Sequence, residues 1–309
     1  MRPANSVLRP CLATATSLFL LASCLPRQVL SLPNTDIVYD RGDPDRGELG
    51  FIDADGSNLE IRNSEAELKV PVWKGDTIYG QTWSGIGGRG GRLSSWRDGM
   101  LSKCPGPGWS VVTYIDGMNA VTTTVDEGEY AIVRVNVATC QLLDTLVQVR
   151  DSQTQKVFGG SLSPDQQRLV YSEVSDYQLM NPDFAVMVMD IASGASRRIA
   201  SGTNATWSPD GKWIAYTHLG GIGIVSPDGT ETHDLLAYTY APYEEDAVVF
   251  IDWSPIPRWS PDSRWLVYHR CTKSQCSTTM DYDIFKLDIT NSDETLVAHG
   301  GAFPYWRSR

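Results

Sequence analysis

Positive charge is scarce in this sequence. Its 26 Lys and Arg residues are outnumbered by 37 Asp and Glu residues, which gives a formal net charge of −11. Because a nucleic-acid-binding surface needs clustered Lys and Arg to replace phosphate counterions, this balance disfavours that class of function. The chain also has only 4 histidines, none at a paired metal-ligand spacing, and no Gly-x-Ser-x-Gly nucleophile motif. We therefore expect no bound metal or cofactor, and a protein that is not an enzyme.

Long apolar runs are also rare. The run from Leu12 to Ala22 is about half of the roughly 20 residues that span a bilayer, and no later run is longer. It follows a short basic stretch that contains Arg2 and Arg9, which is the pattern of a secretory signal peptide. The sequence therefore predicts an exported protein without a transmembrane helix.

The apolar run ends in Leu21-Ala22-Ser23-Cys24, which resembles the lipobox of bacterial lipoproteins. The resemblance implies that residues 1–23 are a signal peptide, that Cys24 becomes the acylated first residue, and that residues 24–35 are a short linker. Leu25 stands where an aspartate usually marks retention in the inner membrane, so the resemblance favours the outer membrane, facing the periplasm. An ordinary secretory signal beside an unmodified Cys24 is the alternative, and export follows from both.

Four further cysteines lie in the mature part, at Cys104, Cys140, Cys271 and Cys276. An even number in an oxidising compartment predicts two disulfides. Sequence proximity favours the pairs Cys104–Cys140 and Cys271–Cys276, although three pairings are formally possible. Zinc is the alternative ligand, but no histidine lies near either pair.

Three segments repeat one pattern, Ser161–Tyr171, Thr206–Tyr216 and Arg258–Tyr268, and each contains Ser-Pro-Asp before an apolar stretch. They start about 45 and about 50 residues apart, which is the length of a four-stranded propeller blade. Proline ends a strand because it cannot donate to the ladder, and the aspartate then caps a tight turn. In the strand after the turn, Ile214 and Tyr216 alternate with Ala215, which predicts burial on both faces.

Weaker copies at Pro71–Tyr79 and Thr124–Ile132 extend this pattern, and Phe303–Trp306 matches only its first strand. The other three strands of that last blade can come from the N-terminal region, at Asp36–Tyr39, Leu49–Ile52 and Leu59–Arg62. Such a closure leaves no open gap in the ring. Six aligned positions then mark six blades: Trp73, Thr124, Leu162, Trp207, Trp259 and Trp306.

The Trp-Ser-Pro-Asp-Gly units, which are WD40-like, and the turn Asp53–Ser57 resemble the repeats of the TolB-like propeller family. The resemblance implies an all-β, six-bladed β-propeller over residues 36–309, closed by strands from both termini. TolB itself has a further domain before its propeller, whereas only residues 24–35 stand there in this chain. A propeller carries many functions, so the fold is implied more firmly than the activity.

Two other motifs resemble ligand-binding loops but are better explained as a flexible loop and a hairpin turn. Gly85–Gly90 has the spacing of a dinucleotide-binding loop, but no βαβ pattern surrounds it. Asp53–Ser57 is similar to a calcium loop, but its glycine comes too early and the distal glutamate is absent. We interpret the first as a flexible loop and the second as a hairpin turn.

The remaining hypothesis is a membrane-anchored binding module for a protein, peptide or glycan, with a propeller-type hydrolase or lyase as the alternative. In an up-and-down blade the first and third turns share one face, so the longer connections are expected on the other: Trp83–Arg92, Glu173–Asp183, Tyr238–Asp246 and Arg270–Asp281. Aromatic side chains on such loops are typical binding hot spots. The candidate partner-binding residues are Tyr238, Tyr240, Tyr243, Glu244, Glu245 and Asp246, although Tyr238 and Tyr240 could instead end a strand and pack between blades.

Overall fold

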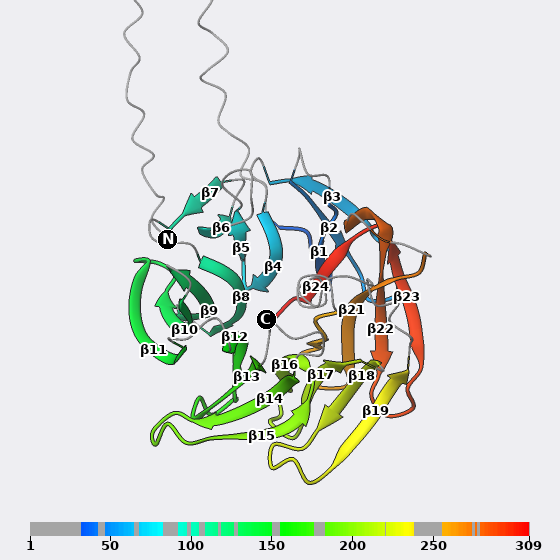
Figure 1. Ribbon diagram of the computed structural model, residues 1–309. Helices are drawn as coiled ribbons and strands as arrows, with labels where there is room; N and C mark the ends of the chain where they lie inside the picture. The colour runs from blue at the N-terminus through cyan, green and yellow to red at the C-terminus, as the bar shows by residue number, and fades with distance from the viewer. Residues whose placement is uncertain are drawn as a thin grey trace, which may run out of the picture. The chain divides into compact units, whose positions relative to one another are not determined.

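In a computed structural model of the chain, six four-stranded antiparallel sheets follow one another around a ring (Figure 1). The ring lies within a unit that spans Ser31–Arg309. The structure describes residues 32–42, 47–64, 68–82, 92–97, 100–104, 109–116, 119–126, 129–149, 155–175, 183–219, 221–237, 255–273, 276 and 279–308. Among them, no helix has the length and apolar character needed to cross a membrane. The six four-stranded sheets confirm the all-β, six-bladed propeller that was predicted from the repeats.

We number the blades 1 to 6 and give the strands of each from the centre of the ring outward. Blade 1 is β24 (Ala302–Trp306), β1 (Ile37–Asp40), β2 (Glu48–Ile52) and β3 (Glu60–Asn63); blade 2 is β4 (Leu68–Lys74), β5 (Thr77–Thr82), β6 (Arg92–Arg97) and β7 (Met100–Lys103); blade 3 is β8 (Trp109–Asp116), β9 (Asn119–Asp126), β10 (Glu129–Asn136) and β11 (Gln141–Val149). Blade 4 is β12 (Gln155–Leu162), β13 (Arg168–Ser175), β14 (Asp183–Asp190) and β15 (Ser196–Ser201); blade 5 is β16 (Thr203–Trp207), β17 (Ile214–His218), β18 (Gly221–Val225) and β19 (Thr232–Ala237); blade 6 is β20 (Arg258–Trp259), β21 (Trp265–Cys271), β22 (Tyr282–Asp288) and β23 (Glu294–His299).

Strands from both ends of the chain complete blade 1. β24 pairs antiparallel with β1, and Trp306 lies opposite Ile37. β1 in turn pairs with β2, and β2 with β3. The C-terminal strand is thus the innermost strand of a blade whose other three strands are N-terminal, as the sequence predicted.

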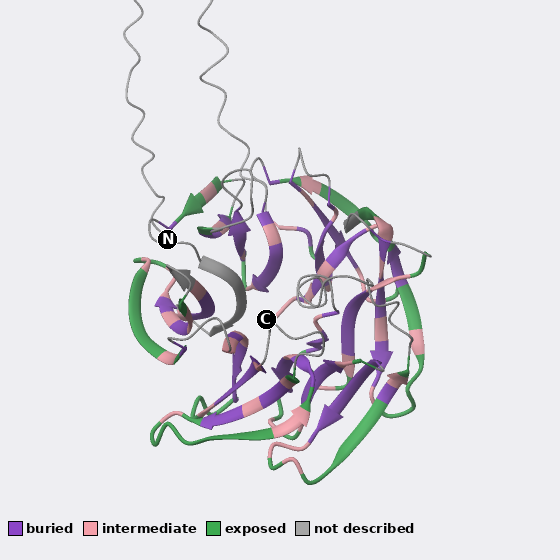
Figure 2. Ribbon diagram, in the orientation of Figure 1, coloured by how far each residue is buried: buried purple, intermediate pink, exposed green. Residues whose placement is uncertain are grey.

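The core is divided among the six seams between blades. Successive residues of a strand point to opposite faces, so one strand serves two seams. In β17, for example, Ile214 and Tyr216 pack with residues of blade 4, whereas Ala215 packs with residues of blade 6. Figure 2 shows the resulting pattern, with buried inner strands and exposed outer strands. Burial on both faces explains why a strand such as β18, Gly221–Val225, is buried at every position.

A repeated hydrogen bond also joins neighbouring blades. Several inner strands have a bulge, at which one residue takes a positive φ, such as Asn204 (φ 56°) and Phe303 (φ 52°). The amide N–H of that residue donates to a buried side chain on the second strand of the preceding blade: Gly159 to Thr123 Oγ1 (3.1 Å), Asn204 to Ser172 Oγ (3.0 Å) and Phe303 to His269 Nδ1 (3.3 Å). At a bulge, the amide N–H of the extra residue has no partner in the strand ladder, and this bond satisfies it.

One predicted repeat position is wrong. Thr124 lies on β9, the second strand of blade 3, and not on its inner strand. The inner strand is β8, where Ile115 pairs with Ala120 before the turn between Asp116 and Asn119. That turn lacks Ser-Pro-Asp, and the similar sequence after Thr124 belongs to the next hairpin, in which Asp126 pairs with Glu129. The count of six blades is unaffected, because blade 3 still contributes one inner strand.

Candidate functional site

The Ser-Pro-Asp turns form rigid hairpins at one face of the ring, which we call the hairpin face. In the turn of blade 5, Ser208 Oγ donates to Asp210 Oδ1 (2.7 Å) and accepts from the amide of Trp213 (3.0 Å). The same bonds recur in the turns that begin at Ser163 and Ser260. Each turn therefore holds its own serine and aspartate side chains, and the amide of Asp210 also donates to Ser263 Oγ in the turn of blade 6 (3.0 Å).

Hydrogen bonds within such turns lower the pKa of Asp165 and of Asp228. The hydrogen bond from Ser163 and that from the Gln167 amide lower the pKa of Asp165. A fourth Ser-Pro-Asp turn, which we did not identify from the sequence, joins β18 and β19, and there bonds from Ser226 and Thr230 lower the pKa of Asp228 to about 2. The carboxylates are occupied by turn donors, which agrees with a capping role.

A hollow of about 910 Å³ opens on the hairpin face, where the inner strands end. Its walls include the last residues of five inner strands and the hairpins that follow three of them, together with the chain after β24. That chain crosses to blade 2, where the Ser308 hydroxyl donates to the carbonyl of Trp73 (2.9 Å). The repeat residues that line the hollow are Leu162, Trp207, Trp259 and Trp306.

The indoles in this wall belong to the packing between blades. Trp259 Nε1 donates to the carbonyl of Thr206 in the preceding blade (3.0 Å), and Trp306 Nε1 donates to that of Arg258 (3.1 Å). Trp207, Trp259 and Trp306 are 5%, 8% and 7% exposed. Since each is more than nine-tenths buried, these rings form a rigid wall and have little free face for stacking on a ligand.

Cationic side chains line the hollow beside the indoles. Lys74, Arg258, Lys286 and Arg307 come from blade 2, blade 6 and the chain after β24. Arg258 is buried, its guanidinium lies 5.3 Å from the ring centroid of Tyr305, and burial lowers its pKa. The hollow thus has a cationic character that the overall charge of the chain does not show.

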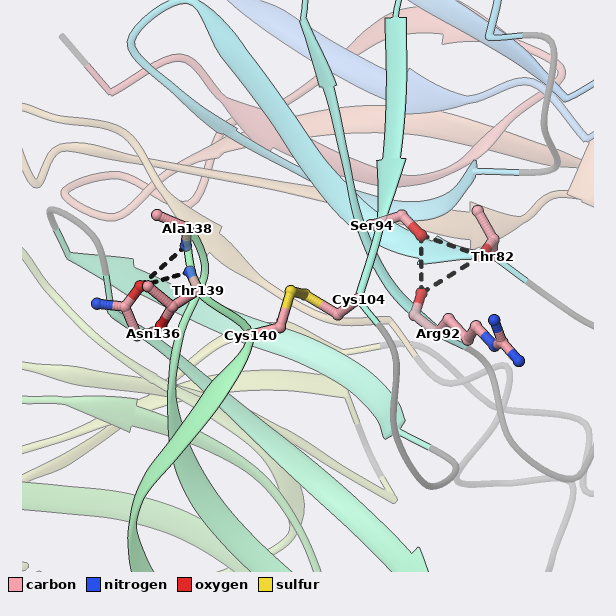
Figure 3. The surroundings of a disulfide bond; sticks show 8 residues. All are labelled: Thr82, Arg92, Ser94, Cys104, Asn136, Ala138, Thr139 and Cys140. Carbon is pink, nitrogen blue, oxygen red and sulfur yellow. Dashed lines mark hydrogen bonds between the residues drawn. A yellow bond between two sulfur atoms is a disulfide. The ribbon is translucent and has the colours of Figure 1, made fainter.

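Both pairs of cysteines form the disulfides that were expected. Cys104–Cys140 joins the end of β7 to the turn between β10 and β11, and so links blade 2 to blade 3 (Figure 3). Asn136 Oδ1 accepts from the amides of Ala138 (3.0 Å) and Thr139 (2.9 Å), which shapes the turn that presents Cys140. Cys271–Cys276 closes a short loop between β21 and β22.

Other predicted site residues lie outside the described residues. These are Cys24 and the candidate partner-binding set Tyr238, Tyr240, Tyr243, Glu244, Glu245 and Asp246. The four segments expected at the face opposite the hairpin face, which we call the loop face, join β5 to β6, β13 to β14, β19 to β20 and β21 to β22, and most of their residues lie outside the described ones. The second turns of blades 3 and 5 are short, however, because β9 and β10 are joined by residues 127–128, and β17 and β18 by residues 219–220. In the described part of the chain, no group of three His, Cys, Asp or Glu residues is placed to hold a metal ion.

No protein-family model matches the sequence, and no curated protein matches it. Solved structures do match the fold. TolB from Acinetobacter baumannii superposes with a TM-score of 0.63 at 18% identity, over 89% of this chain and 67% of that one. A chain of the nidogen/laminin complex superposes with a TM-score of 0.61 at 11% identity, over 89% of this chain and 99% of that one. These likenesses show the fold alone. The chain is a six-bladed propeller that is structurally similar to TolB at low identity.

Proposed function

We propose that this protein is an exported, lipid-anchored propeller that binds a protein, peptide or glycan partner and does not catalyse a reaction. The observation that carries the proposal is the hollow on the hairpin face. Its volume of about 910 Å³ is near the upper end of the range for ligand pockets. Its walls are hairpins held by Ser–Asp hydrogen bonds and indoles packed at the seams between blades, so a ligand would meet a surface that is already ordered.

The chemistry of the lining favours binding over hydrolysis. A serine nucleophile needs an adjacent general base. The described residues that line the hollow include no histidine and no cysteine, and the hydroxyls of Ser208 and Ser260 donate to the turn aspartates Asp210 and Asp262. The hollow therefore has the shape of a ligand site without an activated nucleophile.

Export and anchoring rest on the N-terminal sequence and on the disulfides. Two disulfides are typical of proteins in an oxidising compartment. The lipobox-like segment that ends at Cys24 would tether the protein to a membrane, and the absence of an aspartate after it favours the outer membrane, facing the periplasm.

The experiment is a pull-down from detergent-solubilised native membranes, followed by mass spectrometry and a broad hydrolase and lyase screen of the purified protein. We expect a stoichiometric partner and no turnover. Turnover that depends on residues of the hollow, without any captured partner, would establish the enzymatic alternative.

The same pull-down also shows which face of the ring binds the partner. The loop-face variant Tyr243→Ala, Glu244→Ala and Glu245→Ala is compared with the double variant Lys74→Glu and Lys286→Glu in the hollow. Loss of the partner only in the double variant places the site on the hairpin face. Loss only in the triple variant, with unchanged melting temperature, places it on the loop face.

A further inference from the structure

The lining of the hollow has the opposite charge balance to the whole chain. Four of its residues are cationic and two, Asp36 and Asp262, are acidic, whereas the formal net charge of the protein is −11. Such a local concentration of positive charge attracts anionic groups, because a concave site focuses the field of its charges.

The two acidic side chains of the lining already have donors. Asp36 Oδ2 accepts from the amide of Ala54 (3.1 Å). Asp262 Oδ1 accepts from Ser260 Oγ (2.5 Å) and from the amide of Arg264 (3.1 Å). These carboxylates cap turns and do not reach the cations of the hollow as ion pairs.

Three of the cations have no ion pair with a carboxylate among the described residues. Within the described ranges, no ion pair includes Lys74, Lys286 or Arg307. Lys286 Nζ lies 4.9 Å from the ring centroid of Trp265, and Arg307 donates to Asn34 Oδ1 (2.9 Å). Lys286 also exerts a weak attraction on Asp55, whose carboxylate accepts from Ser57. Their charges are therefore available to a ligand.

The placement of these cations limits the class of ligand. Lys74 ends β4 and Lys286 lies on β22, whereas Arg307 follows β24 and its guanidinium lies 4.9 Å from the ring centroid of Trp73, next to Lys74, so the charges occupy two parts of the ring. An extended ligand with several negative groups could meet the charges in both parts. Three of the four indoles in the wall are almost fully buried, and Lys286 lies 4.9 Å from the ring centroid of the fourth, Trp265, so a charged glycan would gain little from aromatic stacking.

We infer that the hollow binds an extended segment of the partner that is rich in Asp and Glu. This inference deepens the proposed function and rests on it. Carboxylates spaced along an extended chain would pair with Lys74, Lys286 and Arg307 in turn, while the buried indoles and the hairpin prolines form the floor and wall of the site.

The test uses fluorescence anisotropy of a fluorescein-labelled hexaglutamate peptide, with hexaglutamine and hexalysine peptides as comparisons. The variant is Lys74→Glu with Lys286→Glu. Its matched control is Lys103→Glu with Lys212→Glu, which changes the net charge equally at two exposed positions outside the hollow. Thermal melts of both variants check that they are folded.

We expect the hexaglutamate peptide to bind more tightly than the other two, and its binding to weaken as the ionic strength rises from about 0.05 M to about 0.5 M. The hollow variant should weaken binding about tenfold or more, and the control by less than about twofold. Equal binding of all three peptides, no binding of any, or equal loss in both variants would overturn the inference. If a partner is still captured from membranes and the hexaglutamate peptide does not displace it, the proposed function stands and only the ligand class is wrong.

Discussion

Closure of the ring by the C-terminal strand can be tested at Trp306. This side chain is 7% exposed, packs at the seam between blades 1 and 6, and donates to the carbonyl of Arg258. Truncation of a buried Trp to Ala costs about 3–5 kcal/mol, and loss of a neutral hydrogen bond costs about 1 kcal/mol. At about 2–4 °C per kcal/mol, Trp306→Ala should lower the melting temperature by about 10–20 °C.

Two further variants separate the contributions. Trp306→Phe keeps most of the apolar contact and loses the indole N–H, so we expect a fall of about 3–4 °C. Deletion of Gly301–Arg309 removes all of β24 and should cost more than Trp306→Ala. Leu296→Ala, on the outer strand β23 and 40% exposed, is the control and should change the melting temperature by no more than about 2 °C. Calorimetric melting of the wild type and the four variants decides the matter: a deletion variant that melts like the full-length protein would refute the closure.

Three other predictions concern the disulfides, the acid response and the anchor. Replacing Cys104 and Cys140 by Ser opens a link that spans 36 residues of sequence and should cost about 4 kcal/mol of the free energy of unfolding; peptide mapping without reductant that finds these thiols free would contradict the pairing. Because the pKa of Asp228 is about 2 when folded and near 3.8 otherwise, its contribution to stability is present above about pH 4 and lost as the pH falls towards 2, so Asp228→Asn should melt with a shallower pH dependence over that range than the wild type. Cys24→Ser should abolish labelling with radioactive fatty acid, and unchanged labelling would disprove the lipid anchor.

The hairpin face could be predicted because its chemistry is local. In Ser208-Pro-Asp210, every group that makes the turn lies within a few residues of the others, so the pattern is visible in the sequence. Blade 3 shows the limit of this approach. Its first turn lacks the motif, and a resemblance at the next hairpin put Thr124 one strand too far out.

The hollow could not be predicted from the sequence. Lys74, Lys286 and Arg307 are far apart in the chain, and only closure of the ring places them around one opening. Trp207 and Trp306 were recognised as repeat positions, but their place in the wall depends on the packing of neighbouring blades. The positive φ of Phe303 at the inner-strand bulge likewise has no local sequence signal.

Partner capture by the hollow is the most direct test of the account. The wild-type protein and the variant Lys74→Glu with Lys286→Glu would be immobilised at equal amounts and exposed to detergent-solubilised native membranes, and bound proteins would be quantified by mass spectrometry. The account predicts a stoichiometric partner that the wild type retains and the folded variant loses. A partner retained equally by both proteins would contradict the assignment of the hollow as the binding site.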